Sequence, residues 1–474
     1  MGSIPSPRPQ PPAPSPQPPG AMMLQAWLGE PWSGIASTAQ HARNLLAAGS
    51  WDRSALHFLH PTLGDPASVV VVAGQQPAVG GGPLYSLIKL AHAIVVARAL
   101  AREGVPAVAW FWCACEDNDL GEANHADLLL ADGSIARVTA DLGPGRSALH
   151  WRPASRWWDL LVARCQAEFG PGLGGRWLID HAPRGPESMG AWLCRLIGDL
   201  CPGEPVVACE AHRLRHLWAS RLPAACAAWP VEALAQRQRD LLGHGYADPF
   251  GPLPRAPLFH DTAAGRVAID GPDGLPPDEL SPGAALRPIL QQLALPAAAS
   301  ILGPGELAYH AVIGPAYAAL GAQRPQLIPR CSLTLLPNRV ERAAQRLGLS
   351  PEAVADGAAP PPRPPPRSDR LDALAASIDQ LGDPADRRIA AAQVRLRREL
   401  ARLQQSLARG ARHAAGLPAP GSVLGQLRPR GQRQERTLSL FQAIWQHGPG
   451  LMGELIRAAD LTPPGGHRLV TLPD

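Results

Sequence analysis

The chain has 474 residues, of which 46% are hydrophobic and 18% charged, and its formal net charge at pH 7 is +4. This length and composition indicate a folded protein with a sizeable core and more than one structural unit. The small positive charge argues against nucleic-acid binding, and no apolar run reaches the length that a membrane-spanning helix needs.

The cysteines indicate a reducing compartment. All eight are scattered and none forms a C-x2-C pair, so zinc-ribbon spacing is absent. Their mostly apolar surroundings favour reduced thiols that serve as small core residues of a cytoplasmic protein. Cys113 and Cys115 are expected to face opposite sides of a strand. Cys209 and His212 are three residues apart, and we interpret them as a structural pair, so that no metal site is evident.

The first part of the chain predicts a tail and a helical entry to the core. Residues 1–20 are rich in Pro, Ser and Gln and lack the apolar stretch of a signal peptide, which predicts a disordered tail. Residues 27–59 are interpreted as a helical lead-in. The core itself is expected to span residues 21–340.

A strand–loop–helix–strand unit follows, and the rest of the chain is interpreted around it. Residues 68–73 are a β-branched apolar run typical of a buried strand, and residues 74–83 contain four glycines and two prolines. Apolar residues then recur at helical spacing until Gly104, and residues 105–114 form a second apolar run. Two strands joined by a crossover helix predict a parallel pair in an α/β, Rossmann-like sheet.

Both loops of this unit leave the carboxyl ends of their strands, which is where ligands bind in open α/β sheets. The first loop offers glycines and amides before a helix N-terminus, which suits an anionic or polar ligand; its candidates are Gly74, Gln75, Gln76, Gly82 and Tyr85. The second loop suits a cationic group or a metal, through Glu116, Asp117, Asp119, Glu122, Asn124 and His125. The alternative is a plain turn and a solvated acidic loop.

Lys89 is the only lysine among the 44 lysines and arginines of the chain. A lysine kept where arginine is otherwise used suggests a compact ammonium that a planar guanidinium cannot replace. We expect Lys89 to occupy a partly exposed helical position about one turn after the glycine loop and to contact a substrate anion. The alternative is that Lys89 lies on a helix surface and has been kept by chance.

The middle of the chain predicts a helical insertion and a second glycine loop. Residues 150–245 have helical apolar spacing, with a buried strand near 205–209 and tryptophans that we assign to the core. Residues 258–269 are interpreted as a hairpin. Glu306 and Tyr309 follow a glycine cluster and should share one ligand-facing helix face. Arg330 at a strand end suits a carboxylate or phosphate clamp, with a structural salt bridge as the alternative.

The last third of the chain predicts an appendage. Residues 341–416 combine a proline-rich linker at 358–368 with leucines at coiled-coil spacing; these are Leu371, Leu374, Ile378, Leu381, Leu396, Leu400, Leu403 and Leu407. We interpret them as a helical hairpin that self-associates, although a helix packed on its own domain is the alternative. Residues 417–474 are expected to return to the core.

Several spaced motifs resemble one known family. They are Gly74-Gln75-Gln76, Gly82-Pro83-Leu84-Tyr85 with Lys89, Glu116-Asp117-Asn118-Asp119 with Glu122, Asn124 and His125, Leu286-Arg287-Pro288, Gly303-Pro304-Gly305-Glu306 with Tyr309, Pro329-Arg330, and Gln434-Glu435-Arg436. In this order they resemble the BshC family, the cysteine-adding enzymes of bacillithiol biosynthesis. Asn118 stands where the family has histidine, and Gln292 where it has a carboxylate.

The resemblance implies a ligase that adds L-cysteine to glucosaminyl-malate, which is the last step of bacillithiol formation. It also implies a coiled-coil homodimer and suggests ATP as the activating cofactor, although no phosphate motif is present. We assign catalysis to Lys89, Glu116, Asp119 and His125, and substrate binding to Gly74, Gln75, Gln76, Gly82, Tyr85, Asp117, Asn124, Glu306, Tyr309 and Arg330. The alternatives are a non-catalytic scaffold with a decayed Rossmann core, or a ligase for another amino acid or acceptor.

Overall fold

A computed structural model describes residues 28, 32–251, 253, 257–272, 274–358, 369–383, 386–414 and 419–473. The predicted tail, residues 1–20, and the linker residues 359–368 lie outside the described residues. The lead-in forms two helices, α2 (Ile35–Ala48) and α3 (Arg53–His57). Among the helices described here, none combines the length and the apolar character that crossing a membrane requires.

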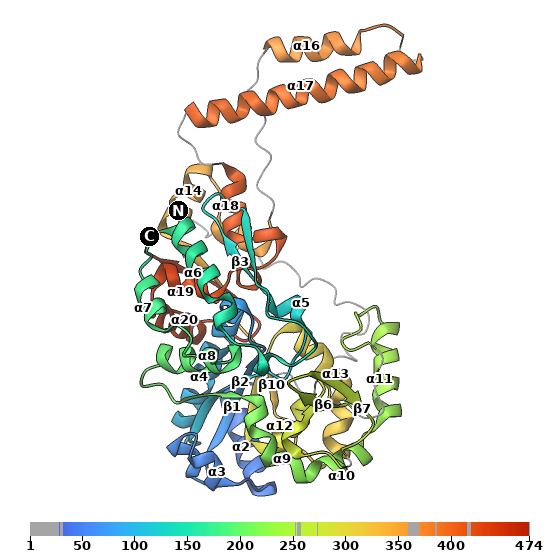
Figure 1. The fold of residues 1–474 in the computed structure, drawn as a ribbon. Helices are drawn as coiled ribbons and strands as arrows, with labels where there is room; N and C mark the ends of the chain where they lie inside the picture. Colours follow the sequence, from blue (N-terminus) through green and yellow to red (C-terminus); the bar gives the residue numbers. More distant parts are fainter. Residues whose placement is uncertain are drawn as a thin grey trace, which may run out of the picture.

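The centre of the molecule is a sheet of five parallel strands (Figure 1). The strands are β1 (Val69–Gln75), β2 (Ala107–Cys113), β5 (Val206–Glu210), β9 (Ala297–Leu302) and β10 (Gln326–Pro329). Their order is β10-β9-β1-β2-β5. The chain therefore adds β2 and β5 on one side of β1 and later adds β9 and β10 on the other side of β1. This is the strand order of a Rossmann sheet, with its switch point between β1 and β9. The predicted α/β, Rossmann-like fold is confirmed.

The crossover helix α4 (Tyr85–Arg102) lies between two layers of protein. It packs against β1 and β2 on one side and against α20 (Leu451–Asp460) on the other. Because it is covered on both sides, its buried residues go round the helix instead of forming one stripe. The C-terminal segment therefore encloses the first strand–helix–strand unit.

The helical insertion differs from its prediction in one respect. The strand expected inside it is β5, which pairs in register with β2, Val206 opposite Ala109, and so belongs to the central sheet. An apolar run of five residues carries no mark of which sheet it joins. The sheet therefore divides the insertion into two parts: α5 (Leu120–Ala123), β3 (His125–Leu129), β4 (Ile135–Thr139), α6 (Ser155–Phe169), α7 (Gly175–Asp180) and α8 (Met189–Leu200) before β5, and α9 (Arg215–Trp218), α10 (Leu222–Ala227) and α11 (Val231–Gly243) after it.

Aromatic side chains join this insertion to the C-terminal segment. Trp157 on α6 meets Trp192 on α8 edge to face, with ring centroids 4.9 Å apart, and meets Phe441 at 6.2 Å. Phe441 belongs to α19 (Leu440–His447), and both tryptophans are fully buried. Aromatic pairs in this arrangement add to the stability gained from area burial. The assignment of these tryptophans to the core is confirmed.

The remaining elements are a hairpin region, the helices next to β9 and the C-terminal part of the chain. The predicted hairpin at residues 258–269 is present as β6 and β7, and β8 extends it. The bounds are β6 (Leu258–Thr262), β7 (Gly265–Ile269), β8 (Leu280–Pro282), α12 (Arg287–Ala294), α13 (Pro304–Ala319), β11 (Ser332–Pro337), α14 (Asn338–Leu347), α15 (Pro351–Asp356), α18 (Pro420–Leu427) and β12 (His467–Leu472). Strands β11 and β12 pair in parallel and return the end of the chain to the core.

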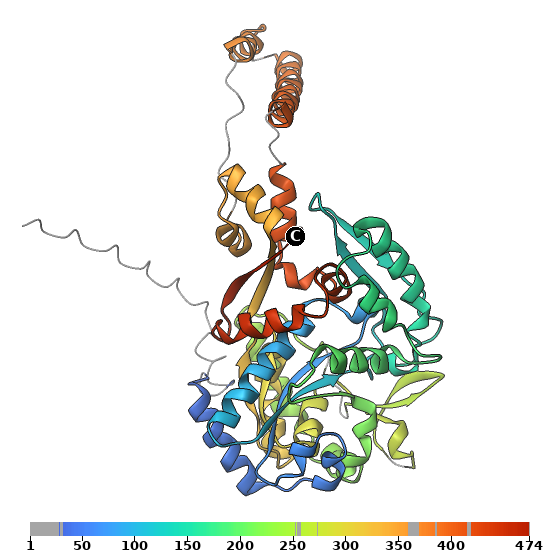
Figure 2. The ribbon, with the colours of Figure 1, turned by 90° about the vertical axis from the view of Figure 1, so that its left-hand side faces the viewer.

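Helices α16 (Asp369–Asp379) and α17 (Arg387–Ala414) form a hairpin. In Figures 1 and 2 they lie side by side at one end of the molecule, away from the central sheet. Ile378 and Leu400 of the predicted seam are buried, whereas Leu396, Leu403 and Leu407 are each more than 40% exposed. The hairpin therefore uses part of its apolar seam internally and leaves part of it uncovered.

The eight cysteines are free thiols. Cys113 and Cys115 do not face opposite sides, because their thiols interact with each other. In an extended chain, residues two positions apart lie on the same face, so the prediction for this pair was wrong. Cys209 and His212 do not pair either: the Cys209 thiol points to the Glu210 carbonyl at 3.6 Å, and His212 contacts Cys115.

Candidate active site

A cavity of about 640 Å³ lies at the carboxyl edge of the sheet, at the switch point between β1 and β9. It is bounded by the ends of β1 and β2, the start of α13, the start of α12 and residues 247–250. In Rossmann sheets the crevice at this point is where ligands bind, because adjacent loops diverge there. This cavity is therefore the candidate active site.

The cavity brings together most of the residues selected from the sequence. Those that line it are Gly74, Gln75, Gln76, Tyr85, Lys89, Asp117, Glu306, Tyr309 and Arg330. Glu122 of the acidic loop also lines it. The other selected residues, Gly82, Glu116, Asp119, Asn124 and His125, do not line this cavity.

Lys89 lies inside the protein and does not present its ammonium freely to the cavity. Its side chain is 1% exposed, and Nζ donates to the Gly74 carbonyl and to both carboxylate oxygens of Glu306 at 2.8 Å. Burial lowers the pKa of Lys89, and the Glu306 carboxylate opposes that shift. The expected partly exposed position was wrong, because the end of β1 and the start of α13 enclose the ammonium through Gly74 and Glu306. Lys89 joins the ends of β1 and β9.

Glu306 completes this connection at the start of α13. Its Oε2 accepts a hydrogen bond from the Gly303 backbone N–H at 2.7 Å, which caps the helix. The same carboxylate pairs with Lys89 and is 26% exposed. Burial raises the pKa of Tyr309, one turn further along, and the charge of Glu306 adds to that effect. The predicted shared face of Glu306 and Tyr309 therefore lies on the cavity wall.

The first glycine loop packs against the C-terminal segment. Gly80 and Gly81 have positive φ angles of 67° and 81°, and a Cβ on either would meet side-chain atoms at about 2.8–2.9 Å, from Leu161 and Leu440 respectively. The Gly82 carbonyl accepts a hydrogen bond from the Leu440 N–H at 2.9 Å. These glycines thus permit close packing with α6 and α19. Gly82 does not line the cavity.

The acidic loop after β2 divides into two groups. Asp117 and Glu122 line the cavity, and Glu122 accepts a hydrogen bond from the Gln76 side chain at 3.1 Å. Asp119 is exposed and caps α5, its Oδ1 accepting from the Glu122 N–H. His125 lies at the start of β3 with Nδ1 3.1 Å from the Asn124 side-chain oxygen, and burial lowers its pKa.

Glu116 is buried behind the cavity in an ion-pair network. Its carboxylate is 2.7 Å from Nε of Arg215, whose other nitrogens reach Asp261 and the Asp278 carbonyl. Arg215 and both carboxylates have less than 5% of their side chains exposed. Glu116 contributes to an adjoining cavity of about 340 Å³ that shares Asp117 and Arg287 with the main one.

The arginines of the cavity are not equivalent. Arg330 forms a buried ion pair with Glu435 at 2.5 Å and lies over the Tyr85 ring. Arg330 therefore forms the structural salt bridge that was the alternative to a ligand clamp. Arg287 is half-buried, whereas Arg436 is exposed, and neither forms an ion pair within the described parts of the chain. Arg287 and Arg436 are therefore the cations available to a ligand.

Sequence reasoning missed two residues deep in the cavity, His310 and Tyr317 on α13. The His310 Nδ1 and the Tyr317 hydroxyl are buried and have no hydrogen-bond partner among the described residues. Burial lowers the pKa of His310 to about 3, so its ring is neutral at pH 7. Their signal was positional, because they follow Tyr309 along one helix, but no motif marked them. The two departures, Asn118 and Gln292, lie outside the cavity lining.

Comparison with known proteins identifies a family model that is similar to part of this chain. The family model described as "Bacillithiol biosynthesis BshC, N-terminal Rossmann-like domain" matches residues 55–169 and 275–331. These segments contain β1, β2, β9 and β10 and most of the cavity wall. These two segments are similar to the BshC Rossmann-like domain. The resemblance to the BshC family is thereby confirmed.

Curated relatives extend this likeness over most of the chain. Proteins named "Putative cysteine ligase BshC" from Koribacter versatilis and Solibacter usitatus are 28% and 27% identical to it. The first alignment covers 84% of this chain and 83% of the relative, and the second covers 84% of each. A third, from Bacillus licheniformis, is 27% identical over 62% of this chain and 61% of its own. The similarity to the BshC proteins thus reaches well beyond the Rossmann-like domain.

Proposed function

We propose that this protein is a ligase that joins the carboxylate of L-cysteine to the amine of glucosaminyl-malate, the last step of bacillithiol formation. The observation that carries the proposal is the composition of the cavity at the switch point. It holds unpaired arginines and acidic side chains together in a chain whose relatives are named cysteine ligases. A zwitterionic amino acid and an acidic acceptor both find complementary charges there.

The charges suggest how each substrate would bind. Asp117 and Glu122 attract the ammonium group of cysteine, whereas Arg287 and Arg436 attract the two carboxylates of the malate part. Amide formation requires the acceptor amine to lose a proton as its nitrogen attacks the activated carboxyl carbon. Asp117 and Glu122 are two of the carboxylates that line the cavity, and they are suited to take that proton. Lys89 instead holds the ends of β1 and β9 in position through Gly74 and Glu306.

A carboxylate must be activated before an amine can displace its oxygen, and we propose ATP as the activating substrate. When bound, ATP would supply a phosphate or adenylate leaving group that removes this oxygen. Gly303 and Gly305 line the cavity at the N-terminus of α13, and a Cβ on Gly305 would meet no neighbouring atom. This open helix start suits an anion. Lys89 is already neutralised by Glu306, and Arg287 and Arg436 are assigned to the malate carboxylates, so the phosphate-binding role falls to the start of α13.

The direct test is the conversion of cysteine, glucosaminyl-malate and ATP to bacillithiol by purified protein, followed by mass spectrometry. Arg287→Gln should reduce kcat/KM for glucosaminyl-malate by roughly 10–100-fold, because a charge-assisted contact contributes about 1.5–3 kcal/mol. Arg176→Gln, on an exposed i,i+4 pair of α7, is the matched control and should leave the rate unchanged.

Two outcomes would reject this function. Conversion of another amino acid or acceptor at a higher kcat/KM would favour a different ligase. Absence of any amide product, together with normal bacillithiol in a deletion strain that has no paralogue, would favour the non-catalytic scaffold. In a producing host, deletion is expected to abolish bacillithiol and to accumulate glucosaminyl-malate in the cytoplasm.

We also propose that the α16–α17 hairpin mediates a homodimer. Leu396, Leu403 and Leu407 expose more than 40% of their surfaces along one helix, and each contributes roughly 1.5–3 kcal/mol when buried. Leu396→Glu with Leu403→Glu should convert a dimer to a monomer in light scattering, with an unchanged melting temperature. Arg398→Glu on the same helix is the control for the added charge. A dimer that persists in the double variant would reject this seam.

A further inference from the structure

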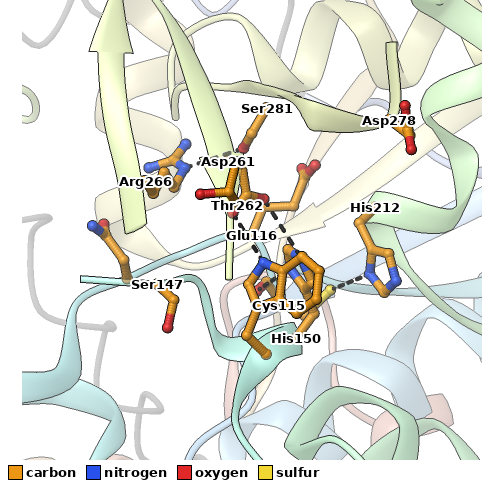
Figure 3. Close-up of polar contacts among 12 residues, drawn as sticks. Cys115, Glu116, Ser147, His150, His212, Asp261, Thr262, Arg266, Asp278 and Ser281 are labelled. Atoms are coloured by element: carbon orange, nitrogen blue, oxygen red, sulfur yellow. Dashed lines mark hydrogen bonds and ion pairs between the residues drawn. The ribbon is translucent and has the colours of Figure 1, made fainter. Parts of the chain in front are cut away.

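Three metal-ligating side chains converge outside the cavity, from segments far apart in the sequence (Figure 3). Cys115 follows β2, His150 lies in the loop before α6, and His212 follows β5. Cys115 Sγ is 3.3 Å from Nδ1 of His212, and one ligand atom from each residue lies within 4.8 Å of the others. The His150 and His212 rings stack with centroids 4.3 Å apart.

Cys115 does not have the surroundings of a catalytic nucleophile. Its side chain is fully buried, and burial raises the pKa of its thiol, so it is protonated at neutral pH. Reactive cysteines instead sit in electropositive, partly exposed places that favour the thiolate. Imidazoles bind metals through a ring nitrogen in the neutral form, and His150 and His212 each place one ring nitrogen within 4.8 Å of the other ligand atoms. The cluster offers soft ligands and little reactivity.

Groups around the cluster support a cation. His150 Nε2 is 3.6 Å from Oδ2 of Asp261, a carboxylate that also accepts from the Trp151 indole at 3.4 Å. Metal-binding histidines commonly have a carboxylate near their second ring nitrogen. Glu116 also lies near the cluster (Figure 3). Its carboxylate and that of Asp261 both pair with the Arg215 guanidinium. Arg266 is a second guanidinium near these carboxylates (Figure 3), so the two arginines offset Glu116 and Asp261. A Cys115 thiolate would add one net negative charge, which favours a bound cation.

The separation of Cys115 and His212 is near that of two ligands in a tetrahedral zinc site. Zinc–sulfur and zinc–nitrogen bonds of about 2.3 and 2.0–2.1 Å imply a sulfur–nitrogen separation of about 3.6 Å, close to the 3.3 Å between Cys115 and His212. Nδ1 of His150 is 3.4 Å from the Cys115 carbonyl oxygen. The ring would therefore need to turn about its Cβ–Cγ bond and give up this contact to direct a lone pair toward the ion. That torsion joins sp³ and sp² atoms and has a broad minimum.

We propose that Cys115, His150 and His212 bind a divalent transition-metal ion of the zinc type. Binding forms a metal–sulfur bond at Cys115, and the thiol proton passes to solvent. The three side chains occupy three positions of a tetrahedron and leave the fourth to water or another small ligand. The bound ion joins the end of β2, next to Glu116 and Asp117, to the loops that precede α6 and α9. This site goes beyond the ligase proposal and does not depend on it.

The test is zinc binding by the full-length protein after metal is removed with a chelator. Competition against a chromophoric chelator should give one tight site per chain. Cys115→Ser and His212→Gln should each weaken zinc affinity by on the order of 100-fold, because loss of even an outer-shell partner costs 10–100-fold. Cys165→Ser, a buried thiol on α6, is the matched control and should bind zinc as the wild type does.

Cobalt supplies a second readout that does not depend on affinity alone. Co²⁺ in the wild type should give tetrahedral absorption bands and a sulfur-to-cobalt charge-transfer band, which Cys115→Ser loses. Circular dichroism of each metal-free variant establishes that it is folded. Equal zinc affinity in wild type and both variants, or a cobalt spectrum without the sulfur band in the wild type, would overturn the proposal in favour of a simple thiol–imidazole hydrogen bond.

Discussion

Replacing Arg215 by methionine is expected to destabilise the protein by roughly 3–5 kcal/mol. The guanidinium lies between the carboxylates of Glu116 and Asp261, and all three side chains are less than 5% exposed. Removing the cation leaves two carboxylates facing each other without water, so each must be protonated or the region must open. Urea denaturation followed by circular dichroism measures the change in the free energy of unfolding.

Two variants separate the loss of buried charge from loss of packing. Arg213→Met removes a neighbouring guanidinium that is 67% exposed beside Glu210, and should cost no more than about 1 kcal/mol. Glu116→Gln with Asp261→Asn in the Arg215→Met background should recover part of the stability, because both remaining partners are then neutral. Equal destabilisation by Arg213→Met and Arg215→Met would contradict the role given to this network.

Lys89→Met should lower both stability and turnover. The ammonium is fully buried and holds Glu306 and the Gly74 carbonyl, so its removal leaves an unpaired carboxylate and an unpaired carbonyl at the cavity. We expect a loss of roughly 2–4 kcal/mol, below the cost for a fully enclosed pair because Glu306 is 26% exposed. The ends of β1 and β9 then lose their connection, and turnover should fall roughly tenfold or more.

Lys89→Arg distinguishes charge from shape at the same position. The charge is kept, but a planar guanidinium is larger than the packed site around Lys89, so we expect a loss of about 1–3 kcal/mol. Lys89→Met with Glu306→Leu should restore much of the stability without restoring activity, and a double-mutant cycle measures the coupling. Arg98→Met, which breaks an exposed pair with Glu204, is the control and should cost less than about 1 kcal/mol. Wild-type melting temperature and rate in Lys89→Arg would show that lysine is not required.

Local structure followed from the sequence wherever residues close in the chain are sufficient to specify it. The apolar run at β1, the glycines after it and the helical spacing of α4 lie within one short stretch, so periodicity and turn chemistry predicted a parallel unit. The same holds for the β6–β7 hairpin and for the shared face of Glu306 and Tyr309. The motifs that resemble BshC also placed most of the selected residues on one cavity.

Only the tertiary structure decided which distant groups meet. Lys89 pairs with Glu306, 217 positions away, and its side chain is buried. The sequence had predicted a partly exposed ammonium. Leu440 covers the first glycine loop, and β5 joins the central sheet. Cys115 meets His150 and His212 only because β2, β5 and a loop end side by side. Local periodicity reports which face of an element is apolar, whereas the choice of partner depends on packing across the whole chain, for which a single sequence carries no local mark.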